Sequence, residues 1–133
     1  PEGTIALAVC GAHLEGQALH WQLADRDAVL VSRGETAPTY RFYALDTTPP
    51  KPGLVRVHEG GAAIAIEVWA LAPAAFASFV DEIPAPLCVG RVVLADGGDV
   101  AGFLCEPAAL EGATEITTFG GWLAYRRSLE SRA

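Results

Sequence analysis

Apolar and polar residues alternate along the chain in short blocks, a pattern typical of a strand-rich protein. Thr4–Val9 is apolar or small on both alternating faces, which predicts a buried strand. Ala28–Arg33 and Tyr40–Leu45 are rich in β-branched or aromatic residues and predict two further strands. Ala62–Leu71 is the longest run and is largely apolar on both faces, so we expect it to lie centrally in a sheet.

Helical spacing and turn residues organise the second half of the chain. Pro73–Asp81 begins with a proline and carries apolar residues along one helical stripe, which predicts a helix. Trp122–Leu129 predicts a second, C-terminal helix. The turn Asp96–Asp99 contains two glycines and separates the apolar runs Val89–Ala95 and Val100–Cys105, which predicts a hairpin.

Two glycine- or proline-rich segments complete the expected fold. Gly60 and Gly61 separate Leu54–Val57 from the long apolar run, which predicts another hairpin. Asp46–Gly53 contains three prolines without an N–H donor, so we expect an irregular loop with Lys51 exposed on it. The resulting class is α+β: a small mixed, largely antiparallel β-barrel with one central and one C-terminal helix.

Composition narrows the possible functions. The 133 residues fit one domain, residues 1–133, and 51% of them are apolar. The net charge of −7 argues against nucleic acid and against an anionic membrane surface as partners. No apolar run reaches the roughly 18 residues of a membrane span. The chain begins with Pro1 rather than Met, which favours a processed chain or a fragment.

The cysteines and motifs exclude several kinds of site. Cys10, Cys88 and Cys105 are far apart and form no CxxC pair, so we expect buried thiols in a reducing cytoplasm and no metal. The chain lacks a phosphate loop and a serine nucleophile elbow, and we expect no cofactor.

The loop Val9–Gly16 is the strongest candidate for chemistry. Gly11 and Gly16 allow backbone N–H groups to approach a ligand, and His13 lies between them. An imidazole is the side chain best suited to move protons near neutral pH. His13 is therefore the candidate acid or base; the alternative is a structural or solvated histidine.

Four other side chains are candidate substrate contacts, each with a structural alternative. Glu67 interrupts an apolar strand, so it lies at a site or pairs with an arginine. Arg41 either clamps a carboxylate or balances Glu67. Tyr40 either donates a phenol proton or fills the core, and Lys51 either reaches an anion or is solvated.

Several segments together resemble the C-terminal domain of allophanate hydrolase. The resemblance runs from about Ile5 to Tyr125 and rests on seven segments in the same order. These segments are Val9–Gly16 with Leu19 and Gln22-Leu23, Ala37–Leu45, Pro50–Leu54, Glu67–Leu71, Ile83–Leu87, Gly102–Glu106 and Thr118–Trp122. The family implies a gamma-glutamylcyclotransferase-like fold.

The resemblance also implies an activity in urea degradation. An amidase-signature domain, in the same or a separate chain, releases ammonia from allophanate, and this domain converts the product, N-carboxycarbamate, to ammonia and carbon dioxide. Carried over by position, Gly11, Ala12 and Leu14 would help to hold the dianion and His13 would be catalytic. Arg41 or Lys51 would supply a cation. Family members usually have Pro and Asn where this chain has Ala18 and His20.

Two other functions stay open. The first is a non-catalytic domain that binds the amidase or forms a homodimer. The second is a free-standing cyclotransferase-like enzyme acting on an amide. Cyclotransferases carry a catalytic glutamate after the central helix, where this chain has Ile83 or Pro84, with Glu82 beside them.

Overall fold

The computed structural model describes residues 2–131, in which eight strands combine with three α-helices and two short 3-10 helices. The elements in chain order are β1 (Ile5–Val9), α1 (Trp21–Ala24), β2 (Val29–Glu35), β3 (Tyr40–Leu45), β4 (Lys51–Arg56), β5 (Ala65–Leu71), α2 (Pro73–Asp81), β6 (Leu87–Val93), β7 (Asp99–Cys105), η1 (Pro107–Leu110), β8 (Thr114–Glu115), η2 (Thr117–Phe119) and α3 (Trp122–Glu130).

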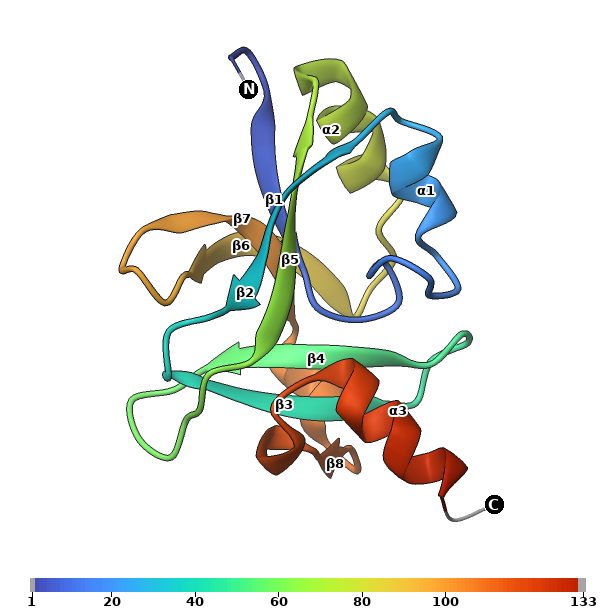
Figure 1. The fold of residues 1–133 in the computed structure, drawn as a ribbon. Helices are drawn as coiled ribbons and strands as arrows, with labels where there is room; N and C mark the ends of the chain where they lie inside the picture. The colour runs from blue at the N-terminus through green and yellow to red at the C-terminus, as the bar shows by residue number, and fades with distance from the viewer. Residues whose placement is uncertain (1, 132–133) are drawn as a thin grey trace.

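The strands form two sheets. The larger sheet has the order β2-β5-β1-β7-β6, and only its β1–β7 pair is parallel. The smaller sheet has the order β4-β3-β8 and is antiparallel. In Figure 1, β3 and β4 run across the lower ends of β1 and β5, with α1 and α2 beside the larger sheet and α3 against the smaller one.

The expected α+β class and the largely antiparallel pairing are confirmed, but the strands do not close into a barrel. Both sheets have free edges along most of their length. An isolated bridge between Thr36 and Leu94 links the ends of β2 and β6 at one point only. The exposed side chains of Val29 and Val31 lie on the edge strand β2.

The helices and one hairpin follow the local sequence pattern. The helix predicted over Pro73–Asp81 is α2, with the same bounds, and the C-terminal helix is α3. The Asp96–Asp99 turn joins β6 to β7 as an antiparallel hairpin, as expected. The position predicted for Ala62–Leu71 inside a sheet is confirmed, because β5 lies between β1 and β2. It is not the longest strand, since β2, β6 and β7 have seven residues as well.

The hairpin predicted at Gly60-Gly61 is wrong. β4 and β5, which flank these glycines, belong to different sheets. A Cβ on Gly61 would lie 2.6 Å from the carbonyl carbon of Thr39, so this loop packs against the start of β3. The glycines therefore let the chain cross from one sheet to the other rather than reverse within a sheet.

The expectation that Asp46–Gly53 is irregular fails at its C-terminal end. β4 begins at Lys51, and Pro52 lies opposite Ala44 of β3. β4 is an edge strand, where a proline without an N–H donor is tolerated. Lys51, expected on an exposed loop, is buried, with 7% of its surface accessible.

One hydrophobic core joins the two sheets. Its fully buried side chains include Leu7 of β1, Phe79 of α2 and Phe42 of β3. In the part of the chain described, no helix is long and apolar enough to cross a membrane. The loop between β1 and α1 runs between the two sheets, and this position determines where His13 lies (Figure 1).

Candidate functional site

His13 lies in an aromatic clamp after the end of β1. Its ring is stacked on Phe103 of β7, with centroids 5.0 Å apart and planes 10° apart. Phe79 of α2 meets the same ring edge-on at 5.1 Å. Only 6% of His13 is exposed, so the imidazole is held in one orientation and largely removed from water.

Gln22 is the polar partner of His13. The imidazole Nε2 lies 2.8 Å from Gln22 Oε1. A carboxamide oxygen only accepts, so Nε2 carries the proton and Nδ1 is the nitrogen left to gain one. The pKa of His13 is lowered from 6.5 to about 4. Burial is the largest cause, the Gln22 hydrogen bond opposes it, and the electrostatic effects of Lys51 and His20 act in the same direction as burial. The imidazole is therefore neutral at pH 7.

Lys51 is the single lysine of the sequence and the cation nearest to this chemistry. It is buried, yet none of the carboxylates in residues 2–131 forms an ion pair with it. Its position follows from the close approach of the Pro52 ring to the Gly11 backbone. A Cβ on Gly11 would lie 2.2 Å from Pro52 Cδ, so only glycine lets β4 pack against the loop that carries His13.

His13 and Lys51 line one cavity of about 180 Å³. Its wall is built from four separate segments of the chain. The lining residues are His13, Leu19, Gln22, Pro49, Lys51, Glu82, Ile83, Pro84, Leu87 and Phe103. A largely buried lysine that forms no ion pair, on the same small cavity as a neutral imidazole, suits a compact anion that also needs a proton.

The loop residues expected to hold a dianion do not all lie at the His13 cavity. Gly11 and Ala12 line a narrow space of about 10 Å³ that His13 and Lys51 also border. The Leu14 N–H donates to the Gly11 carbonyl oxygen at 3.0 Å, so this donor is occupied within the turn. The Leu14 side chain lines a different pocket, beside α3.

Glu67, Arg41 and Tyr40 do not line the His13 cavity. Glu67 pairs with Arg33 at 3.3 Å and also accepts the backbone N–H of Glu15 and the indole N–H of Trp69. The pairing of Glu67 with an arginine was expected, but the partner is not Arg41.

The other two residues have contacts elsewhere in the fold. A guanidinium N–H of Arg41 donates to the Glu59 carbonyl oxygen. The Tyr40 hydroxyl oxygen is fully buried and accepts the Val93 N–H at 2.8 Å. The structural alternative for Tyr40, a side chain of the core, is confirmed, whereas Arg41 neither lines the His13 cavity nor balances Glu67, so both expectations for Arg41 are wrong. No common site gathers Arg41, Tyr40 and Glu67.

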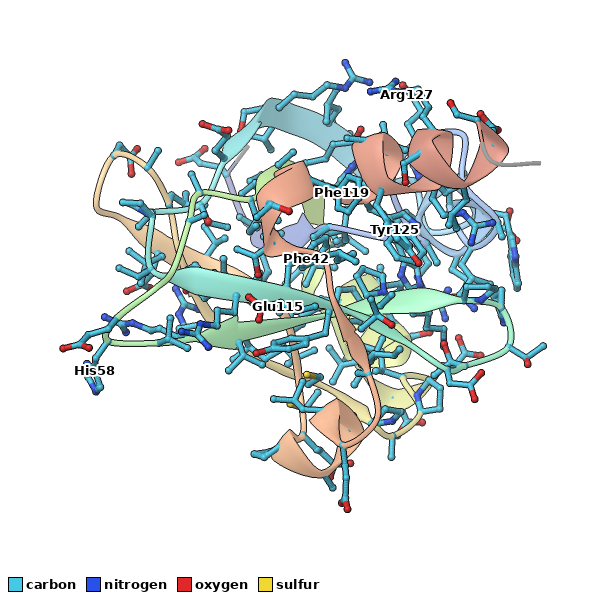
Figure 2. The ribbon with its side chains drawn as sticks, turned by 90° about the horizontal axis from the view of Figure 1, so that it is seen from below. Phe42, His58, Glu115, Phe119, Tyr125 and Arg127 are labelled. Atoms are coloured by element: carbon cyan, nitrogen blue, oxygen red, sulfur yellow. The ribbon has the colours of Figure 1, made fainter. Side chains whose placement is uncertain are left out.

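The other two histidines differ in their surroundings. His20 donates from Nδ1 to the carbonyl oxygen of His13 at 2.8 Å and packs against Trp69, so it supports the loop. His58 lies at the tip of the loop after β4 and points away from the protein (Figure 2). Residues 2–131 contain no group of His, Cys, Asp or Glu side chains that could hold a metal ion.

Two polar residues of the cavity were not among the candidates: Gln22 and Glu82. Gln22 lies nine positions after His13, in a segment that carries the family resemblance, which did not indicate a contact between the two side chains. Glu82 follows α2, where charged residues are ordinarily solvated. No local pattern in the sequence marks either residue, because the cavity brings together segments that are distant along the chain.

The fold places the chain in a broad class. The crystal structure of an AIG2-like protein from Mus musculus matches with a TM-score of 0.62, over 82% of this chain and 84% of that one. At 18% identity this likeness shows the fold alone. The gamma-glutamylcyclotransferase-like fold expected from the sequence is therefore confirmed as a fold.

Closer comparisons define the family. The family model described as allophanate hydrolase C-terminal domain matches residues 5–127, and the chain belongs to this family. The allophanate hydrolase of Kluyveromyces lactis matches with a TM-score of 0.91 and 40% identity, over 95% of this chain and 21% of that chain. The urea amidolyase of Saccharomyces cerevisiae is 37% identical over 99% of this chain. This chain spans only 8% of that relative's length.

The same fold also occurs in a short chain. A structure described as a uropathogenic E. coli-specific protein is 36% identical, with a TM-score of 0.86. The match covers 92% of this chain and 95% of that one. Relatives therefore include both much longer chains and a protein of about this size.

Proposed function

We propose that this domain converts N-carboxycarbamate to ammonia and carbon dioxide in cytoplasmic urea degradation, after an amidase has acted on allophanate. The observation that carries the proposal is that Lys51, largely buried and without an ion pair in residues 2–131, lines the same cavity as the neutral imidazole of His13. Membership of the allophanate hydrolase C-terminal domain family supports the choice of this substrate. The cavity supplies a cation and a proton carrier for it.

Binding would use charge complementarity. N-carboxycarbamate carries two carboxylates on one nitrogen, and the unpaired Lys51 would bind one of them. The second carboxylate would lie toward His13. A negative charge beside an imidazole favours its protonated form and raises its pKa, so His13 would take up a proton as the dianion binds.

The reaction needs protons at nitrogen. In the first step an N–C bond breaks, its electron pair stays on nitrogen, and carbon dioxide leaves. A proton from His13 to that nitrogen gives carbamate. Carbamate loses carbon dioxide in the same way, and a second proton at nitrogen yields ammonia. His13 would deliver these protons through Nδ1, since Gln22 holds Nε2.

A coupled assay tests the proposal. An amidase domain supplied with allophanate generates the substrate, and carbon dioxide release is compared with and without the 133-residue chain. The chain should accelerate release above the spontaneous background, and His13→Ala and Lys51→Met should each abolish the acceleration. Arg56→Met is the matched control, because Arg56 is an exposed cation on the same strand as Lys51. Acceleration that persists in His13→Ala would refute the assigned role.

The alternative, a non-catalytic domain that binds the amidase, has one observation in its favour. Val29 and Val31 are each more than half exposed on the edge strand β2. Two exposed apolar side chains on the edge of a sheet are typical of a surface that binds another protein. Sedimentation of the chain with and without the amidase domain tests this function. A complex lost in Val29→Thr/Val31→Thr would support it, and a monomer without affinity for the amidase would exclude it.

A further inference from the structure

Arg26 follows α1, and its guanidinium connects α1 to α2 and to the residue after α2. One Nη donates to the Gln22 carbonyl oxygen at 2.9 Å. Nε and the other Nη donate to Ser78 Oγ at 3.2 and 2.9 Å, and the same Nη pairs with the Glu82 carboxylate. The guanidinium also lies 5.7 Å from the centre of the Phe79 ring. With 15% of its side chain exposed, Arg26 is held in place from several directions.

Its ion-pair partner, Glu82, belongs to the wall of the Lys51–His13 cavity. The cavity wall therefore contains one cation and one carboxylate. Left unpaired, the Glu82 charge would repel any anion that entered and would act against Lys51. The Glu82 side chain is 61% exposed, so solvent weakens this repulsion without removing it. The repulsion grows with the charge of the ligand, so a dianion would be penalised about twice as strongly as a monoanion in free energy.

We propose that Arg26 is a specificity-determining residue: by pairing with Glu82 it neutralises the cavity wall and makes the cavity selective for small dicarboxylate dianions. This inference rests on the proposed function, because it assigns the charge preference of the same cavity. Arg26 touches no substrate and acts through Glu82.

Malonate is the probe, because it replaces the N–H of N-carboxycarbamate with CH₂ and does not decompose. Monomethyl malonate has the same skeleton with a single charge. Calorimetric titration of both ligands should show that Arg26→Gln weakens malonate binding roughly threefold to fivefold. The same variant should weaken monomethyl malonate binding only about twofold. Glu82→Gln should tighten malonate binding.

The double variant separates charge from structure. Arg26→Gln/Glu82→Gln should bind malonate within about twofold of wild type, because both charges are gone. Arg91→Gln is the matched control; Arg91 pairs with Asp99 on the β6–β7 hairpin, away from the cavity, and its loss should leave binding unchanged.

Two results would overturn the inference alone. Equal weakening of both ligands in Arg26→Gln, or a double variant as weak as Arg26→Gln, would mean that Arg26 only holds α1 in place. A wild-type chain that binds no malonate would instead overturn the proposed function, and the inference would fall with it.

Discussion

At the scale of the residue, the surroundings of His13 and Lys51 give them their chemistry. The imidazole lies between Phe79 and Phe103 and is neutral at pH 7, while the single lysine is buried without a carboxylate partner. The sequence predicted His13 as the candidate, since a histidine between glycines is a visible pattern. It did not predict the burial of Lys51, because nothing local indicates that the strand β4 begins there.

The depressed pKa of His13 makes stability depend on pH. The unfolded chain protonates this imidazole near pH 6.5, whereas the folded chain resists protonation until about pH 4. Stability is therefore complete above pH 6.5 and is lost as the pH falls toward 4, by about 3 kcal/mol in total. Between pH 6.5 and pH 4, the free energy of unfolding measured by urea titration should fall by about 3 kcal/mol less in His13→Gln than in wild type. His58→Gln, at an exposed position, should keep the wild-type dependence.

Lys51→Met should remove function and leave stability nearly unchanged. Methionine has a similar length and flexibility, so it keeps the packing of this largely buried side chain. The free energy of unfolding should change by less than about 1 kcal/mol in urea titrations. Malonate binding should fall more than about tenfold, the loss of one charge-assisted contact. A variant that is destabilised yet still binds malonate would contradict the place given to Lys51.

At the scale of the element, local patterns predicted which segments form helices and strands, but not every partner. α2, α3 and the β6–β7 hairpin follow directly from spacing and turn residues. The Gly60-Gly61 segment has the same turn chemistry as a hairpin, yet it carries the chain between sheets, because β5 pairs with β1 and β2 instead. Pairing between distant strands depends on the packing of the whole fold, which a local turn does not determine.

The contact of Gly11 with Pro52 should be sensitive to a single methyl group. Gly11→Ala would place Cβ against a rigid proline ring, forcing the loop and β4 apart. We expect a loss of about 1–3 kcal/mol in urea unfolding, together with weaker malonate binding as Lys51 moves away from His13. Gly34→Ala on β2 is the matched control, since a Cβ there meets nothing within 4 Å. It should change stability by less than about 0.5 kcal/mol.

At the scale of the whole molecule, the cavity is formed where the two sheets meet. It needs the loop after β1, the start of β4, the segment after α2 and a side chain of β7. The residues assembled there are distant along the chain, which is why Gln22 and Glu82 were not predicted. Tyr40 and Arg41 were candidates by residue type alone, and they lie on another part of the fold.

The shared core predicts that the two sheets unfold together. Trp69 lies in β5 of the larger sheet and Trp122 at the start of α3, and both belong to one cluster of buried side chains. Tryptophan fluorescence and far-UV circular dichroism should therefore report one coincident urea transition, as expected for one cooperative domain. Two separated transitions would show that the sheets are independent folding units.

The most direct test of the dianion site is an NMR titration with malonate. Lys51 is the only lysine, so its side-chain resonance cannot be confused with that of another lysine. The account predicts that the Lys51 and His13 resonances shift together, at the same malonate concentrations, and that the His13 pKa rises above its free value of about 4, while His58 is unaffected. A Lys51 resonance that does not move, or a His13 pKa that stays at its free value while malonate binds, would contradict it.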